Sequence, residues 1–165
     1  MSNEGADTFM HLHRLEKIWL GIGVAMLAVF LIVIGTMAFT MGMTPPSAHH
    51  HTIDPTKVSE TAPFDRPGLA QTGDNRYEAV MVAYAFGYEP EAMEVPVGAT
   101  VDFMVTSSDV VHGFYVVGTN INLMVVPGEV SHISHTFDKP GEYLILCNEY
   151  CGSGHEYMKT TIVVK

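Results

Sequence analysis

The chain has 165 residues, a length that suits one ordinary domain plus an anchor or a tail. Acidic side chains outnumber basic ones by 18 to 8, and the formal net charge is −10 at pH 7. A chain with this negative charge repels the phosphate backbone, so we exclude nucleic acid as a partner.

A membrane anchor is the first element that the sequence predicts. Residues 18–53 contain no Asp, Glu, Lys or Arg, and residues 18–39 are almost continuously apolar. This run would reach about 33 Å as a helix, enough to cross a bilayer core of roughly 30 Å. It is longer than the apolar part of a signal peptide and lacks an Ala-x-Ala cleavage site. We therefore predict a cytoplasmic segment at 1–17 and a transmembrane helix at 18–41.

The orientation of this helix follows from the basic residues beside it. Arg14 and Lys17 precede the helix directly, whereas only Lys57 follows it within reach. The positive-inside rule then places the N-terminus in the cytoplasm. The rest of the chain is expected on the extracytoplasmic, periplasmic side of the cell membrane, an oxidising compartment in which cysteines form disulfides or bind metals.

Residues 42–75 are rich in Pro, Thr and Ser and predict an extended linker. His49, His50 and His51 lie in it, and we interpret them as solvated residues without a role in the chemistry. From residue 76 to 165, short apolar segments alternate with Gly and Pro turns. Seven strands are predicted there: 77–86, 92–97, 100–107, 112–117, 130–137, 141–147 and 159–165. This pattern favours an antiparallel sandwich or small Greek-key barrel.

The sequence "LCNEYCGSGHEYMK", residues 146–159, connects the last two predicted strands and contains both cysteines of the chain. Within twelve positions it has four side chains that can bind a metal: Cys147, Cys151, His155 and Met158. A loop held at both ends by a sheet can keep several ligands in place. The loop is therefore the candidate functional site.

Four chemistries fit these residues. A Cys147–Cys151 disulfide would close a small ring and leave the histidine and methionine unused. Structural zinc with His112 as fourth ligand would leave the thioether unused, and mononuclear blue copper would leave one thiol unused. Two coppers bridged by both thiolates use every residue, with one histidine on each metal and the thioether and the Glu149 carbonyl as weak axial ligands. The residues favour this last arrangement, with the others as alternatives.

The loop sequence "CNEYCGSGHEYM" resembles the dinuclear copper A loop of cytochrome c oxidase subunit II, Cys-x-Glu-x-Cys-Gly-x-x-His-x-x-Met. The upstream "SSDVVHGFYV" is similar to the segment that supplies the first histidine in that family, with Asp109 three residues before His112. The stretches "YAFGYEPEAMEVPVGA" and "GTNINLMVVPGEVS" resemble the B-type haem–copper oxidases. The resemblance implies an all-β cupredoxin-like domain after a single anchor helix.

The resemblance also implies the ligands of two copper ions: His112, Cys147, Glu149, Cys151, His155 and Met158. Both cysteines would bridge the coppers. His112 and Met158 would complete one copper, and His155 with the main-chain oxygen of Glu149 would complete the other. The Glu149 carboxylate is in addition a candidate ligand of a magnesium ion at the interface with the catalytic subunit.

The function implied by the resemblance is that of the electron-accepting subunit of a terminal oxidase. Electrons would come from cytochrome c or a cupredoxin and pass to haem in catalytic subunit I, which reduces oxygen to water and translocates protons. This chain has no Cys-x-x-Cys-His haem signature, so haem belongs to the partner and the chain is not active alone. The alternative is a free-standing, membrane-tethered cupredoxin that carries electrons or copper.

Two positions outside the loop are candidates for a role in the same function. Tyr84, Phe86 and Tyr88 are expected on one face of a strand by two-residue alternation, and Phe86 is the candidate for electron transfer from the donor. Glu16, at the cytoplasmic end of the helix, is a candidate for proton collection. From Asp54 onward there are fifteen acidic and six basic side chains, which would steer a basic donor.

Overall fold

The structure, a computed structural model, describes residues 14–40 and 52–165. The chain divides into two compact units, Met1–Met43 and Thr44–Lys165. His49, His50 and His51 of the predicted linker lie outside the described residues.

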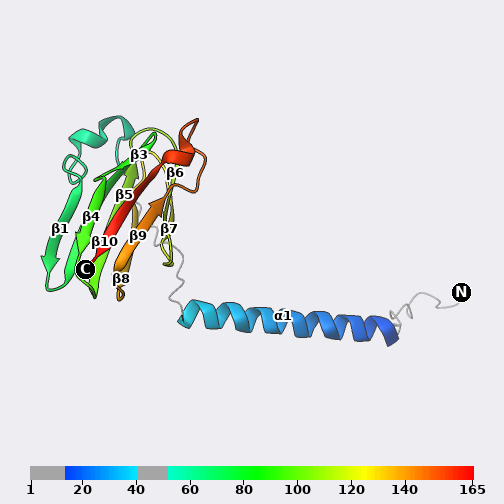
Figure 1. The fold of residues 1–165 in the computed structure, drawn as a ribbon. Coiled ribbons are helices and arrows are strands. Elements are labelled where there is room, and N and C mark those ends of the chain that lie inside the picture. The colour runs from blue at the N-terminus through cyan, green and yellow to red at the C-terminus, as the bar shows by residue number, and fades with distance from the viewer. Residues whose placement is uncertain (1–13, 41–51) are drawn as a thin grey trace, which may run out of the picture. The chain divides into compact units, whose positions relative to one another are not determined.

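The described part of the first unit is one helix, α1 (Arg14–Thr40), of 27 residues (Figure 1). Its apolar side chains are exposed on all sides, and at about 1.5 Å per residue it is about 40 Å long. It begins four residues before the predicted start, because Arg14, Glu16 and Lys17 form its first turn. Within the described residues, α1 is the one helix whose length and composition suit a membrane span.

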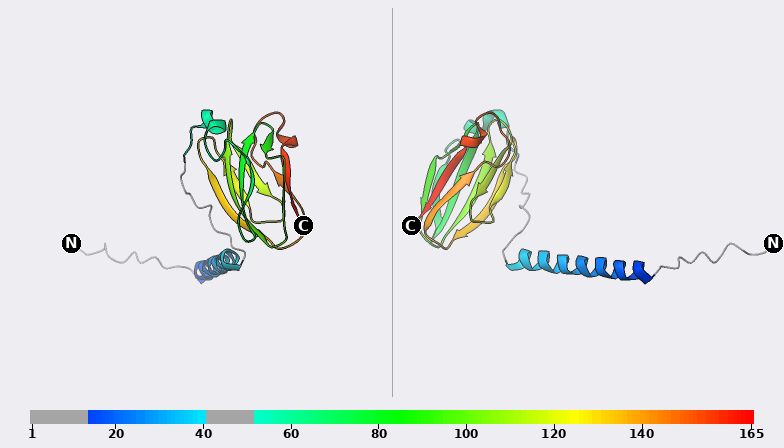
Figure 2. Two further views of the ribbon diagram at one scale, coloured as in Figure 1. Left: turned by 90° about the vertical axis from the view of Figure 1, so that its left-hand side faces the viewer. Right: turned by 45° about the vertical axis from the view of Figure 1, so that its right-hand side comes forward.

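The second unit is a sandwich of two five-stranded sheets (Figures 1 and 2). The first sheet has the order β1-β2-β5-β8, with β3 paired to β2. Its strands are β1 (Gly68–Gly73), β2 (Arg76–Tyr84), β3 (Gly87–Glu89), β5 (Ala99–Ser107) and β8 (Ser131–Phe137). The second sheet has the order β4-β10-β9-β6-β7. Its strands are β4 (Ala92–Val95), β6 (His112–Val116), β7 (Asn122–Val125), β9 (Gly141–Leu146) and β10 (Lys159–Val164).

The seven predicted strands are all present, but the predicted number of strands was too low and the predicted antiparallel pairing was only partly right. Three further strands, β1, β3 and β7, have no strong alternation of apolar residues, and two of them have only three or four residues. The sheets are also mixed rather than antiparallel, because β2 pairs with β5 and β10 pairs with β4 in parallel. Each parallel pair joins strands that are not connected by a tight turn, and no local sequence signal marks such pairing.

The core between the sheets comes from period-two alternation within the strands. On β5, Val101, Phe103 and Val105 are buried, whereas Asp102 and Met104 point to the other face and are half-buried. The Phe103 ring lies 5.5 Å from Phe114 of the opposite sheet and 6.4 Å from Phe137. Each such side chain contributes about 1.5–3 kcal/mol on burial. The aromatic core fixes the two sheets against each other.

The predicted linker is not an extended segment throughout. A 3-10 helix, η1 (Pro55–Glu60), and strand β1 both fall within residues 42–75. Val58 and Phe64 are buried against Val80, Val82 and Val130 on the outer face of the first sheet. The prediction was wrong for this part because two isolated apolar residues in a Pro- and Thr-rich segment carry no periodic signal.

An ion pair on the first sheet predicts how stability depends on pH. Arg76 lies 2.8 Å from Asp102, which also accepts a hydrogen bond from Ser134. Burial raises the pKa of Asp102, but the bonds from Ser134 and Arg76 outweigh burial and leave the pKa below its ordinary value. The stabilisation is therefore present above the unfolded pKa of about 3.9 and is lost as pH falls through the folded pKa.

Asp102→Asn should accordingly lower the free energy of unfolding at neutral pH, with a difference from wild type that narrows below about pH 4. Urea unfolding of the full chain in detergent at neutral and acidic pH measures this. An equal difference at both pH values would contradict the assignment.

Candidate metal centre

The β9–β10 connection is held closely at both ends. The last pair of the β9–β10 ladder joins Leu146 to Lys159, and the Cys147 N–H donates to the Met158 carbonyl at 3.3 Å. A short 3-10 helix, η2 (His155–Tyr157), completes the turn back into β10. Cys147 and Met158 therefore face each other where the loop leaves the sheet, and both are buried.

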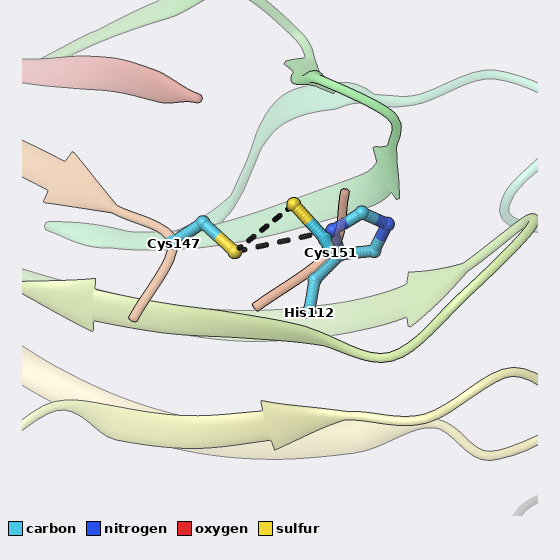
Figure 3. A group of neighbouring side chains, drawn as sticks. All are labelled: His112, Cys147 and Cys151. Carbon is cyan, nitrogen blue, oxygen red and sulfur yellow. Dashed lines mark hydrogen bonds between the residues drawn. The ribbon is translucent and has the colours of Figure 1, made fainter. Parts of the chain in front are cut away.

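The two cysteines are free thiols in contact. Their sulfur atoms lie 3.9 Å apart, nearly twice the disulfide bond length of about 2.05 Å (Figure 3). Two thiolates bound to one metal at about 2.3 Å in a tetrahedral arrangement are separated by about 3.8 Å. The spacing thus fits a shared metal and not a disulfide.

His112 joins this pair from the neighbouring strand of the same sheet, as the first residue of β6, which pairs with β9. Its Nδ1 lies 3.9 Å from the Cys147 sulfur, and its side chain is fully buried (Figure 3). The ligand atoms of His112, Cys147 and Cys151 all lie within 4.8 Å of one another. A histidine 35 residues before the first cysteine thus completes a compact group of three metal-binding side chains.

The other three predicted ligand residues surround the same sulfurs. The Glu149 carbonyl oxygen lies 3.1 Å from the Cys147 sulfur. The Nδ1 of His155 lies 3.5 Å and the thioether sulfur of Met158 lies 3.6 Å from the Cys151 sulfur. The structure therefore brings all six predicted residues together around the two thiols. Met158 is buried, whereas His155 is half-buried at the edge of the cluster.

The local environment disfavours a free thiolate at Cys151. Burial, followed by the hydrogen bond and charge of Cys147, raises the pKa of the Cys151 thiol to about 11. A metal ion that binds here must displace a proton, and its positive charge would compensate for the buried sulfur charge.

Asp109 holds His112 in place. Its Oδ1 lies 2.7 Å from His112 Nε2 and accepts the Val110 N–H at 2.6 Å, and its Oδ2 accepts the Ala85 N–H at 2.7 Å. Burial raises the pKa of Asp109, but the bonds from His112, Val110 and Ala85 outweigh burial and lower it. The carboxylate directs the other ring nitrogen, Nδ1, toward the cysteines, as carboxylates do for metal-binding histidines.

Asp109→Asn should weaken copper binding by about 10–100-fold, because an amide cannot accept hydrogen bonds at both positions. Competition with a copper chelator measures the affinity. Asp102→Asn is the matched control, since Asp102 is a hydrogen-bonded carboxylate on the outer face of the first sheet, and should bind copper as wild type does. Equal affinity for all three chains would show that Asp109 does not position His112.

Tyr84, Phe86 and Tyr88 do not share one strand face, and that prediction was wrong. β2 ends at Tyr84 and β3 begins at Gly87, so the chain reverses between them, and Ala83 pairs with Tyr88. Tyr88 is buried, whereas Tyr84 and Phe86 are each 38% exposed. The alternation rule fails here because a tight turn interrupts the strand.

The Phe86 ring nevertheless lies on the candidate metal loop. A Cβ added to Gly154 would lie 2.5 Å from this ring, and one added to Gly152 would lie 3.0 Å from it. These two glycines flank Ser153, between Cys151 and His155. Phe86 therefore packs directly over the loop and still reaches the surface.

Sequence reasoning missed one contact of the cluster. The Gly113 N–H donates to the Cys147 sulfur at 3.3 Å. A main-chain donor cannot be recognised from residue types. The one sequence feature connected with it is the glycine directly after His112, because this position has no room for a side chain. His135 contacts Asn120 and Phe137 rather than the cluster.

Comparisons with known proteins identify the family of the chain. The family model for the periplasmic domain of cytochrome c oxidase subunit II matches residues 88–165. A cytochrome c oxidase subunit 2 of Thermus thermophilus is 50% identical over 153 residues, which cover 91% of each chain. A second Thermus thermophilus subunit 2 sequence is 52% identical over 122 residues, covering 73% of this chain and 90% of the relative.

Solved structures give the same result for the fold. A chain of a haem–copper terminal oxidase dimer, solved by cryo-electron microscopy, has a TM-score of 0.76 and 33% identity, and the match covers 92% of this chain and 100% of that one. The periplasmic domain of subunit II of the Bradyrhizobium japonicum cytochrome oxidase has a TM-score of 0.50 at 20% identity, over 53% of this chain and 83% of that one, which supports the cupredoxin-like fold alone. With an all-β cupredoxin-like domain after one apolar helix, the chain belongs to the cytochrome c oxidase subunit II family.

Proposed function

We propose that the cluster binds two copper ions and that the chain accepts electrons for a terminal oxidase. The observation that carries the proposal is the pair of free, buried thiols at 3.9 Å, with two imidazoles, a thioether and a main-chain carbonyl around them. His112 and Met158 would hold one copper, and His155 with the Glu149 carbonyl would hold the other. Cys147 and Cys151 would be shared by both.

The donor set favours this arrangement over its alternatives. Zinc would not use the Met158 thioether, which lies within 3.6 Å of a thiol. A single copper with one thiolate would leave a second thiol in contact with it. The dinuclear centre uses all six donors, and the half-buried Glu149 carboxylate is then left for a magnesium ion at the interface with the catalytic subunit.

When copper is bound, the pair shares one electron, so that each metal changes its bonds little on reduction. The protein keeps the site dry and its ligands fixed. Both cysteines, His112 and Met158 are at least nine-tenths buried, and Asp109 fixes the His112 ring. A rigid ligand shell of this kind lowers the cost of reorganisation on each electron transfer.

Electrons reach the centre from the exposed side of the loop. His155 is half-buried there, and Phe86 contacts Gly152 and Gly154 while remaining partly exposed. A cytochrome c or a cupredoxin that docks over Phe86 would touch a ring that packs directly on the ligand loop. The acidic excess of the domain steers a basic donor to this surface. The electron then passes to haem in the catalytic subunit, where oxygen is reduced to water with proton translocation.

The anchor sets the geometry of the complex. α1 spans the membrane with its N-terminus in the cytoplasm, and the copper domain lies on the periplasmic side. Glu16, in the first turn of α1, then lies at the cytoplasmic end of the helix, where it collects protons for the partner subunit.

Purification of the tagged chain from native membranes tests this function. We expect a multi-helix haem protein to copurify, and the preparation to consume oxygen with reduced cytochrome c. A free-standing cupredoxin would instead be isolated without haem and without oxygen consumption, although it would still bind copper.

A further inference from the structure

Tyr88 is a buried tyrosine next to the candidate metal centre that no proposed step uses. It is 1% exposed, and its ring lies edge-on to Phe114 at 5.8 Å. Its hydroxyl donates to the Gly113 carbonyl at 2.5 Å. The phenol of a tyrosine has an ordinary pKa of about 10, so the hydroxyl is protonated at neutral pH and acts as the donor in this bond.

Gly113 links this tyrosine to the bridging sulfur. Its carbonyl accepts from Tyr88, and its N–H donates to the Cys147 sulfur at 3.3 Å. Both groups are attached to the same Cα, so the bond from Tyr88 restrains the position of Gly113 and with it the amide. Tyr88 therefore helps to hold the one main-chain N–H that, within residues 14–40 and 52–165, donates to the Cys147 sulfur.

The opposite side of Gly113 is equally constrained. A Cβ at this position would lie 1.9 Å from the Asn148 Oδ1 and 2.6 Å from the Asn148 main-chain nitrogen. The Asn148 amide in turn donates to Asn122 of β7 at 3.0 Å. The strand and the loop thus meet at Gly113 without room for a side chain, and small displacements of this residue reach the sulfur directly.

We propose that Tyr88 is a positioning residue that raises the reduction potential of the copper centre by holding the Gly113 N–H on the Cys147 sulfur. The inference rests on the proposed function. A hydrogen bond to a thiolate is stronger when the sulfur carries more negative charge, as it does in the reduced centre. The bond therefore favours reduction, in line with the general effect of sulfur hydrogen bonds on metal potentials.

Tyr88→Phe in the full chain tests the proposal, because it removes the hydroxyl and keeps the ring. We expect the two-copper spectrum and the copper content to persist, and the reduction potential to shift downward relative to wild type. A spectroelectrochemical titration of the copper-loaded chain in detergent measures the shift.

Tyr143→Phe is the matched control. Tyr143 is half-buried, and its hydroxyl also donates to a main-chain carbonyl, that of Lys139 at 3.0 Å, on the β8–β9 connection. A purely structural role for the phenol hydroxyl would lower the melting temperature of both variants alike. We expect only Tyr88→Phe to change the potential.

An unchanged potential in Tyr88→Phe, or an equal shift in Tyr143→Phe, would overturn the inference and leave the proposed function intact. A wild-type chain without a two-copper spectrum would instead contradict the proposed function itself. If Tyr88→Phe fails to load copper, resonance Raman spectra of the copper-loaded wild-type chain test whether the Gly113 N–H donates to the Cys147 sulfur. Deuteration of the main-chain amides should shift the frequency of the copper–sulfur vibration. An unshifted frequency would show that no N–H donates to the sulfur.

Discussion

Cys151→Ser should reduce the copper content from about two ions to about one per chain and abolish the mixed-valence signal. The serine oxygen does not bridge two coppers as a thiolate does, so the second metal loses one of its bridging ligands. The Cys147 thiolate, the two histidines and Met158 remain, and they can still hold one copper. Metal analysis together with electron paramagnetic resonance measures both effects on the full chain in detergent.

His51→Ala is the control for this variant. His51 belongs to the histidine run that the sequence places in the linker, outside the described residues. It should leave the copper content and the signal unchanged. A loss of copper in His51→Ala, or a retained two-copper signal in Cys151→Ser, would contradict the assignment of both cysteines as bridges.

Gly113→Ala should destabilise the domain by about 3 kcal/mol, because the added methyl group overlaps the main chain of Asn148. The backbone nitrogen of Asn148 cannot rotate away, in contrast to the end of a flexible side chain. For a domain of this size, the melting temperature should fall by roughly 10 °C. Thermal unfolding of the metal-free chain measures this loss without any contribution from copper.

Gly68→Ala is the matched control, since a Cβ at Gly68 on β1 meets no atom within 4 Å. This variant should melt within a few degrees of wild type. Similar melting temperatures for the two variants would show that the strand and the loop do not meet closely at Gly113.

Much of the β domain could be predicted because its core strands carry their own signal. β10 alternates buried and more exposed residues along its length, and β5 does so as far as Val105, and turns rich in Gly and Pro separate the strands. Their partners could not be predicted in the same way. Parallel pairing of β2 with β5 depends on contacts between segments that are distant in sequence, and no local pattern records it.

The errors have a common physical cause. Val58 and Phe64 are buried in a segment that composition assigns to a linker, because tertiary packing rather than periodicity decides their burial. Tyr88 leaves the face of Tyr84 because the chain turns at Phe86, between two strands that the alternation rule treats as one.

The site was predictable as far as side chains identify it. The spacing of Cys147, Cys151, His155 and Met158 marks one loop, and the family resemblance supports His112 and the Glu149 carbonyl as the remaining ligands. The hydrogen bond from Gly113 was not predictable, because its donor is main chain. Nor could spacing reveal that the Asp109 carboxylate joins His112 to the turn that carries Phe86.

The electron paramagnetic resonance spectrum of the copper-loaded full chain tests the central claim most directly. Two equivalent copper nuclei that share one unpaired electron give seven hyperfine lines, accompanied by a purple colour, and this is the predicted result. A four-line spectrum from a blue protein, or a colourless chain that binds zinc in preference, would contradict the dinuclear centre.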